Sequence, residues 1–148
     1  MKETGLLFTP ENYDKVARGE KTQTRRILKW QPDSSGAILG PREMEEQPGV
    51  WLYNGQRFTC PYGTAGDRLY AQHAAVRQRR CCIELTDVRV ERVQEITETD
   101  AISEGCLDAY GPDFHVGAFR KLWQSINGKG SWKRNDWVWV LSYRKVQP

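Results

Sequence analysis

Long hydrophobic runs are missing from this sequence. The apolar stretches are only a few residues long, and none approaches the roughly 20 residues that a helix needs to cross a bilayer. The chain begins Met-Lys-Glu-Thr-Gly and lacks the apolar segment of a secretory signal peptide at this point. We therefore expect a cytoplasmic protein that does not associate with membranes.

Histidine and cysteine, the residues that most often bind zinc, are scarce. The two histidines, His73 and His115, are far apart and have no partner one helical turn away. The cysteines have neither the C-x-x-C spacing of zinc sites nor the density of a disulfide-stapled secreted domain; they are Cys60, Cys81, Cys82 and Cys106. We expect free thiols, no metal site and no cofactor.

The abundant residue types are those of a globular protein. The chain has 148 residues, 39% of them hydrophobic, with six Trp, six Tyr and four Phe, which is enough for one core without metals or disulfides. We expect a single domain over residues 1–148. The net charge is only +3, but Lys and Arg cluster at residues 25–29, 77–80 and 129–134. Such clusters form either a solvated surface or a polyanion-binding one.

The first part of the chain predicts a strand, a helix and a second strand. Residues 5–9 (GLLFT) form a short apolar run that is typical of a buried strand. Thr9 followed by Pro10 is a typical helix start, with an N-cap residue before a proline in the first turn. Gly19 suits the left-handed C-terminal cap, so the helix should end near Arg18.

The next segment lacks periodicity. Residues 30–48 contain three of the seven prolines, and irregular segments of this length are usually functional or mobile. Asn54-Gly55 then lies between two strand-like runs within residues 49–63, which indicates a hairpin with a type I′ turn. We expect an insertion around residues 30–56.

Strand patterns resume at residues 68–76 and 79–96. The apolar positions of the second run change parity between Leu85 and Val88, which indicates a β-bulge. The last run, residues 136–146, is apolar on both faces, so it should lie in the centre of a sheet.

Two further helices are expected late in the chain. Thr97 and Asp100 fit a capping box at the start of residues 97–105, and residues 117–128 are amphipathic. About five to seven strands with short helices inserted early and late predict an α+β fold, a mixed β-barrel with flanking helices.

Polar and charged side chains are concentrated in residues 19–26, GEKTQTRR. Lys21 can cooperate with Thr24 only if it lies in the turn before the strand, because residues three apart on a strand face opposite ways. Thr24 and Arg26 would share a face. A threonine hydroxyl becomes a nucleophile when a base removes its proton, and a guanidinium can hold a phosphate or carbonyl. The alternative is a charged strand edge that prevents aggregation.

This segment resembles the signature of the ASCH family, Gly-x-Lys-x-x-[Thr/Glu]-x-Arg. Three further segments are similar to a subgroup common in phage and prophage genomes: CPYGTAGDRLY, VERVQEITETDAISEG and the last segment, from Phe119 to Val146. The resemblance covers nearly the whole chain and implies a PUA-like mixed barrel.

The resemblance also implies a role in RNA or nucleoside chemistry. Some small bacterial members are amidohydrolases that remove the acetyl group of N4-acetylcytidine with a Lys, Thr and Glu triad. The matching residues here are Lys21, Thr24 and, within DAISEG, Glu104. Many relatives carry Arg-Glu-Thr where this chain has AQHAA, so a changed substrate or a loss of catalysis is also open.

Five residues are candidates for substrate binding: Arg25, Arg26, Trp30, Tyr70 and His73. An exposed Trp30 could stack on a base, and His73 could contact the substrate or be structural. We therefore expect the partner to be a nucleoside or single-stranded RNA. Three functions of the protein are open: deacylation of an N4-acylcytidine by Lys21, Thr24 and Glu104, binding without chemistry, or metal-independent cleavage of single-stranded RNA.

Overall fold

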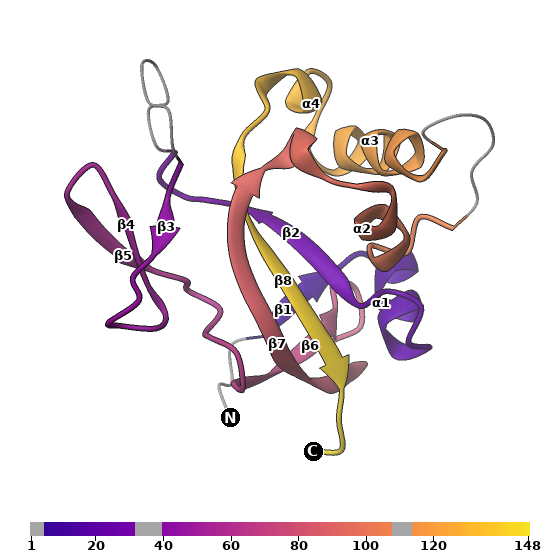
Figure 1. The fold of residues 1–148 in the computed structure, drawn as a ribbon. Coiled ribbons are helices and arrows are strands. Elements are labelled where there is room, and N and C mark those ends of the chain that lie inside the picture. The colour runs from indigo at the N-terminus through magenta and orange to yellow at the C-terminus, as the bar shows by residue number, and fades with distance from the viewer. Residues whose placement is uncertain (1–4, 32–39, 108–113) are drawn as a thin grey trace.

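The computed structural model describes residues 5–31, 40–107 and 114–148. Its main sheet is strongly curved and has the strand order β1-β6-β7-β8-β2 (Figure 1). Only β1 and β6 are parallel, and the other neighbours are antiparallel. The strands are β1 (Leu6–Phe8), β2 (Gln23–Ile27), β6 (Arg68–His73), β7 (Arg80–Arg92) and β8 (Trp137–Lys145). The edges of this sheet are β1 and β2.

The helices pack on both faces of the main sheet (Figure 1). Residues of the first helix share a core with Trp139 and Leu141, whereas the later helices share a core with Val138 and Val140 on the other face. Thr9 caps α1 as expected, since its hydroxyl accepts from the Asn12 N–H. Thr97 and Asp100 form the expected capping box at α2. The helices are α1 (Pro10–Ala17), the 3₁₀ turn η1 (Val93–Glu95), α2 (Glu98–Ser103), α3 (Phe114–Asn127) and α4 (Ser131–Arg134). Among the described residues, no helix is long and apolar enough to cross a membrane.

A second, three-stranded sheet lies at the left of Figure 1, away from α2 and α3. It consists of β3 (Arg42–Glu43), β4 (Val50–Tyr53) and β5 (Gln56–Thr59). Asn54 and Gly55 have φ angles of 53° and 79°, as the predicted type I′ turn requires. Trp51 packs edge-on against Trp139 of β8, with ring centroids 5.7 Å apart. The small sheet is thereby attached to the main core.

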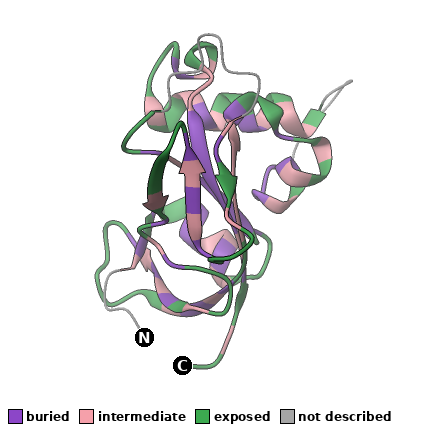
Figure 2. Cartoon of the chain, turned by 60° about the vertical axis from the view of Figure 1, so that its left-hand side comes forward, coloured by how far each residue is buried: buried purple, intermediate pink, exposed green. Residues whose placement is uncertain are grey.

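The core has two parts, and buried residues follow the central strands (Figure 2). Because β8 is apolar on both faces, it contributes to both parts. Trp139 and Leu141 face the inside of the curved sheet and share a core with α1, whereas Val138 and Val140 pack with α2 and α3. The second part also contains Phe119 and Trp123 of α3, which places this helix over the sheet.

The α+β class, the central position of β8 and the bulge in β7 are confirmed. The β7–β8 register shifts between Leu85 and Asp87, where the apolar pattern changes parity. Three features differ from the expectation. The strands number eight among the described residues because a small second sheet is present; α3 begins at Phe114; and α4 is an additional short helix. The five-stranded main sheet is a mixed half-barrel, open between β1 and β2, in agreement with the expected mixed-barrel fold.

Gly40 provides a test of packing between the insertion and β8. A methyl group at this position would overlap the ring of Trp137, which is buried. We expect Gly40→Ala to lower the free energy of unfolding by about 1–3 kcal/mol, measured by urea denaturation. Gly117→Ala in α3 is the control, because no heavy atom lies within 4 Å of the added carbon. It should be neutral or stabilising, and equal stability of the two variants would contradict this packing.

Candidate functional site

A cavity of about 190 Å³ lies at the open side of the main sheet. The edge strands β1 and β2, the start of α1, the end of α2 and one face of α3 all contribute to its wall. Its polar residues are Thr9, Asn12, Lys21, Thr24, Arg25, Arg26, Glu104 and Asn127, and its apolar residues are Leu7, Phe8, Ile27, Phe119, Leu122, Trp123 and Ile126.

The turn between α1 and β2 sets the position of Lys21. Gly19 has φ +79°, the left-handed conformation expected after a helix. The backbone N–H of Lys21 then bonds the Lys15 carbonyl at 3.1 Å, and the Thr22 N–H bonds the Ser103 carbonyl at 2.7 Å. Lys21 therefore precedes β2, as predicted, and the turn is tied to α2.

Lys21 and Glu104 form a buried ion pair, although they are far apart in the sequence. The Lys21 Nζ donates to Glu104 Oε1 at 2.7 Å and to the Glu104 carbonyl at 2.9 Å. Their side chains are only 3% and 2% exposed. An ammonium group has three N–H donors, so one remains for the cavity or its contents.

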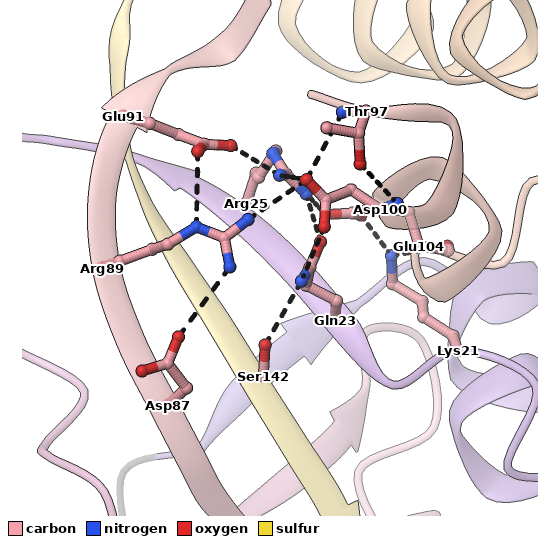
Figure 3. A network of polar contacts seen from close by, with 10 residues as sticks. All are labelled: Lys21, Gln23, Arg25, Asp87, Arg89, Glu91, Thr97, Asp100, Glu104 and Ser142. Carbon is pink, nitrogen blue, oxygen red and sulfur yellow. Dashed lines mark hydrogen bonds and ion pairs between the residues drawn. The ribbon is translucent and has the colours of Figure 1, made fainter. Parts of the chain in front are cut away.

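Arg25 is the centre of the network that holds this pair (Figure 3). Its guanidinium donates to Glu104 Oε2 at 3.0 Å, to Glu91 at 2.7 Å and to Asp100 at 3.2 Å. Gln23 accepts a further bond at 2.6 Å. Both Glu104 oxygens therefore accept from a cation, and the carboxylate is fixed between Lys21 and Arg25.

Thr24 offers a hydroxyl to the cavity. The residue is 5% exposed and lines the cavity. Its hydroxyl makes no hydrogen bond within residues 5–31, 40–107 and 114–148, and it is not among the fully buried unpartnered atoms. Because buried hydroxyls normally have a partner, this group is ready to bond a ligand.

Arg26 connects the two edges of the open sheet. Its Nη2 donates to the Leu7 carbonyl of β1 at 2.8 Å, and its guanidinium lies 4.8 Å from the centre of the Phe8 ring. Burial lowers the pKa of Arg26 below its ordinary value. Thr24 and Arg26, two residues apart on β2, both line the cavity.

Two further side chains near the ion pair have pKa values above their ordinary values. Burial raises the pKa of the Cys106 thiol to about 11, and burial followed by the Glu104 charge raises that of Tyr143 well above its ordinary value. Both side chains are therefore neutral at physiological pH. Cys106 is correspondingly a poor candidate for a nucleophile.

Among the sequence-predicted binding residues, Arg25 lines the cavity but is engaged by carboxylates, and Trp30, Tyr70 and His73 lie outside it. The Arg25 side chain is 0% exposed and engages carboxylates, so it supports the cavity wall rather than a ligand. Trp30 is 46% exposed but packs against Tyr53 and Phe58 of the small sheet, outside the cavity. Residue type alone could not indicate these orientations, because tertiary packing decides them.

Tyr70 and His73 also lie outside the cavity. Tyr70 stacks under Arg80, with the guanidinium 4.1 Å from the ring centre, and lines a separate hollow. His73 is 4% exposed, and its Nδ1 accepts from the Ala75 and Val76 N–H groups. The imidazole therefore caps the turn after β6, which is the structural alternative considered for it.

Asp100 makes the stability of the network depend on pH. Burial alone would raise its pKa, but the Thr97 N–H bond and the charges of Arg25 and Arg89 outweigh burial and lower it. A lowered folded-state pKa means that the ionised group stabilises the fold above the unfolded value of about 3.9, and that this stabilisation is lost as the pH falls through the folded value.

We therefore expect Asp100→Asn to lower the free energy of unfolding by about 1–3 kcal/mol at pH 7. The difference from the unmodified protein should shrink below about pH 4, as urea denaturation at several pH values would measure. Asp87→Asn is the control, because Asp87 is 58% exposed and lies 3.8 Å from Arg89. A pH-independent difference for Asp100→Asn would contradict the assignment.

In the described part of the chain, no group of three or more His, Cys, Asp or Glu residues is placed to bind a metal ion. This finding applies to residues 5–31, 40–107 and 114–148. The cavity instead combines an ion pair, a free hydroxyl, a guanidinium and an apolar wall.

Comparisons with known proteins show the fold. No family model and no curated protein matches the sequence. The structure resembles that of an Enterococcus faecalis V583 protein of family model DUF984, with TM-score 0.55 and 13% identity over 99% of this chain and 82% of that one. An ASCH domain from Lactobacillus crispatus JV V101 also matches, with 15% identity over 97% of this chain and 80% of that one. Its TM-score of 0.46 is too low to support an inference. The likeness to the Enterococcus protein shows a shared fold, and the activity must be inferred from the cavity.

Proposed function

We propose that this chain is an ASCH-type, PUA-like amidohydrolase that removes the acyl group from N4-acetylcytidine or a similar N4-acylated cytosine. One observation carries the proposal. Lys21 and Thr24 come from one segment and Glu104 from another, 83 residues away from Lys21, and all three line a single cavity, in which the Thr24 hydroxyl has no partner among the described residues. A hydroxyl beside a lysine and an orienting carboxylate is a typical arrangement for nucleophilic catalysis.

The first step is attack by the Thr24 Oγ1 on the amide carbonyl carbon. The 2.7 Å contact allows Lys21 to pass one proton to Glu104, which leaves an uncharged amine beside a carboxylic acid without changing the net charge of the pair. That amine accepts the Thr24 proton as the C–O bond forms. When the C–N4 bond breaks, the proton moves to the leaving N4 of cytidine. Water then hydrolyses the acyl–threonine ester and releases the acid.

The geometry favours a positioning role for Glu104. Both its oxygens accept from cations, at 2.7 Å and 3.0 Å, so it holds Lys21 and exchanges a proton with it. Direct protonation of the leaving amine by Glu104 would require the carboxyl group to leave this network. Lys21, which carries the proton taken from Thr24, is therefore the better proton donor to the leaving group.

The size and lining of the cavity suit a base with a small substituent. Pockets for drug-sized ligands occupy roughly 300–1,000 Å³, whereas this one has about 190 Å³. The apolar side of α3, with Phe119 and Leu122, gives a planar base a surface for packing. Metal-independent cleavage of RNA would need a group that transfers protons, and the His73 imidazole cannot serve in this cavity, because the ring lies outside it and its Nδ1 is engaged.

The test is incubation of the purified protein with N4-acetylcytidine and detection of cytidine and acetate by chromatography. We expect turnover by the unmodified protein and none above background for Lys21→Met. Thr22→Val, which changes an exposed residue beside β2, should retain activity. Cytidine binding without turnover would favour the non-catalytic alternative, and neither binding nor turnover would contradict the proposed substrate class.

A further inference from the structure

Asn12 is a polar residue on the buried side of α1 that the proposed chemistry does not use. It is 7% exposed and lies beside the buried Tyr13, one helical turn before Val16. Its backbone N–H bonds the Thr9 hydroxyl at 3.4 Å, so the helix cap uses the main chain and not the carboxamide.

The Asn12 carboxamide has no hydrogen-bond partner within the described part of the chain. Its atoms are also not among the fully buried unpartnered atoms, so they reach accessible space. The residue lines the cavity, and we infer that this is the space that the carboxamide reaches. A carboxamide has two N–H donors and an acceptor oxygen, and an almost buried one without partners is costly unless a ligand or water bonds it.

We propose that Asn12 reads the hydrogen-bonding edge of a planar ligand in this cavity, and that it selects an edge with an acceptor next to a donor. On cytosine these are ring N3 and the N4–H. An asparagine carboxamide can bond such a pair in two parallel hydrogen bonds, as it does with the N7 and N6 of adenine in DNA. This inference rests on the proposed function for the choice of base, and it makes Asn12 a specificity-determining residue.

The variants Asn12→Leu and Asn12→Asp separate ligand recognition from a structural role. Leucine removes the polar group at similar size, and since no described residue bonds the carboxamide, the melting temperature should not fall. Aspartate keeps the shape and suits the first turn of a helix, but it replaces the donor by an acceptor. Uridine presents the reversed pair, a donor at ring N3 beside the acceptor O4. A carboxylate only accepts, so it can bond one group on either base, and aspartate should remove the advantage of cytidine and shift the preference toward uridine.

The measurement is calorimetric titration of the intact protein and both variants with cytidine and with uridine. We expect cytidine to bind the unmodified protein more tightly than uridine, and Asn12→Leu to weaken cytidine binding by about 10- to 100-fold. In Asn12→Asp the ratio of the two dissociation constants should move toward uridine by about tenfold or more.

Three results would overturn the inference: unchanged cytidine affinity in Asn12→Leu, a melting temperature that falls by several degrees in that variant, or binding of neither nucleoside to the unmodified protein. The hydrolysis assay keeps the two proposals distinguishable. Turnover with Asn12-independent binding would contradict only the role of Asn12, whereas Asn12-dependent binding without turnover would contradict only the amidohydrolase.

Discussion

Thr24→Val should reduce the turnover of N4-acetylcytidine by at least about 10³-fold, because the variant lacks the attacking oxygen. Valine has nearly the same shape as threonine, and no described residue bonds the Thr24 hydroxyl. The fold should therefore stay intact, with an unchanged melting temperature. Single-turnover chromatography with excess enzyme measures the chemical step itself.

Thr22→Val is the matched control for this prediction. Thr22 lies two residues earlier and its side chain is exposed, so the same change of atoms occurs outside the cavity. Its backbone contact with Ser103 does not depend on the side chain. If Thr24→Val and Thr22→Val retained equal activity, Thr24 would not be the nucleophile.

Arg25→Met should lower the free energy of unfolding by about 3–5 kcal/mol. The substitution keeps much of the apolar stem but removes the guanidinium that contacts Glu91, Asp100 and Glu104. Three carboxylates would then face one another at a partly or fully buried site. The midpoint of urea denaturation, with the slope m checked for two-state behaviour, gives the loss.

Arg144→Met is the control for Arg25→Met. Arg144 pairs with Glu84 at 2.8 Å, but its side chain is 63% exposed. An exposed pair contributes about 0–1 kcal/mol, so this variant should change the free energy of unfolding by no more than that. If the two substitutions lowered the free energy of unfolding equally, burial would not explain how strongly the Arg25 network stabilises the fold.

Local sequence patterns predict an element well where a few neighbouring residues determine its geometry. Thr97 with Asp100, Asn54 with Gly55, and the parity change after Leu85 each act over a few residues, and each has the expected structure. The second sheet was missed in part because β3 has only two residues and no period. The opening between β1 and β2 depends on long-range register, which a local pattern does not contain.

The site was predictable in part for the same reason. Lys21 and Thr24 are neighbours in the chain, so their spacing and the Gly19 turn indicate that they cooperate. Glu104 lies 83 residues from Lys21, and only the family resemblance pointed to it. Asn12 was missed, although a signal was present: a polar residue occupies a position of α1 that shares the buried face with Val16.

The remaining candidates show why residue type alone is insufficient. By residue type, the Trp30 ring can stack on a base and the His73 imidazole can contact a substrate. Trp30 instead packs on Phe58, with centroids 5.9 Å apart, and His73 accepts two backbone N–H bonds. Which way a side chain points is decided by tertiary packing.

A crystal structure of Thr24→Val soaked with N4-acetylcytidine tests most directly whether Lys21, residue 24 and Glu104 surround a reacting amide. The variant should trap the unreacted compound in the cavity between β1, β2 and α3. We expect the amide carbonyl carbon about 3–3.5 Å from the position of the missing oxygen, with the Lys21–Glu104 contact retained. An empty cavity at saturating ligand, or ligand bound with its acyl group pointing away from residue 24, would contradict the account.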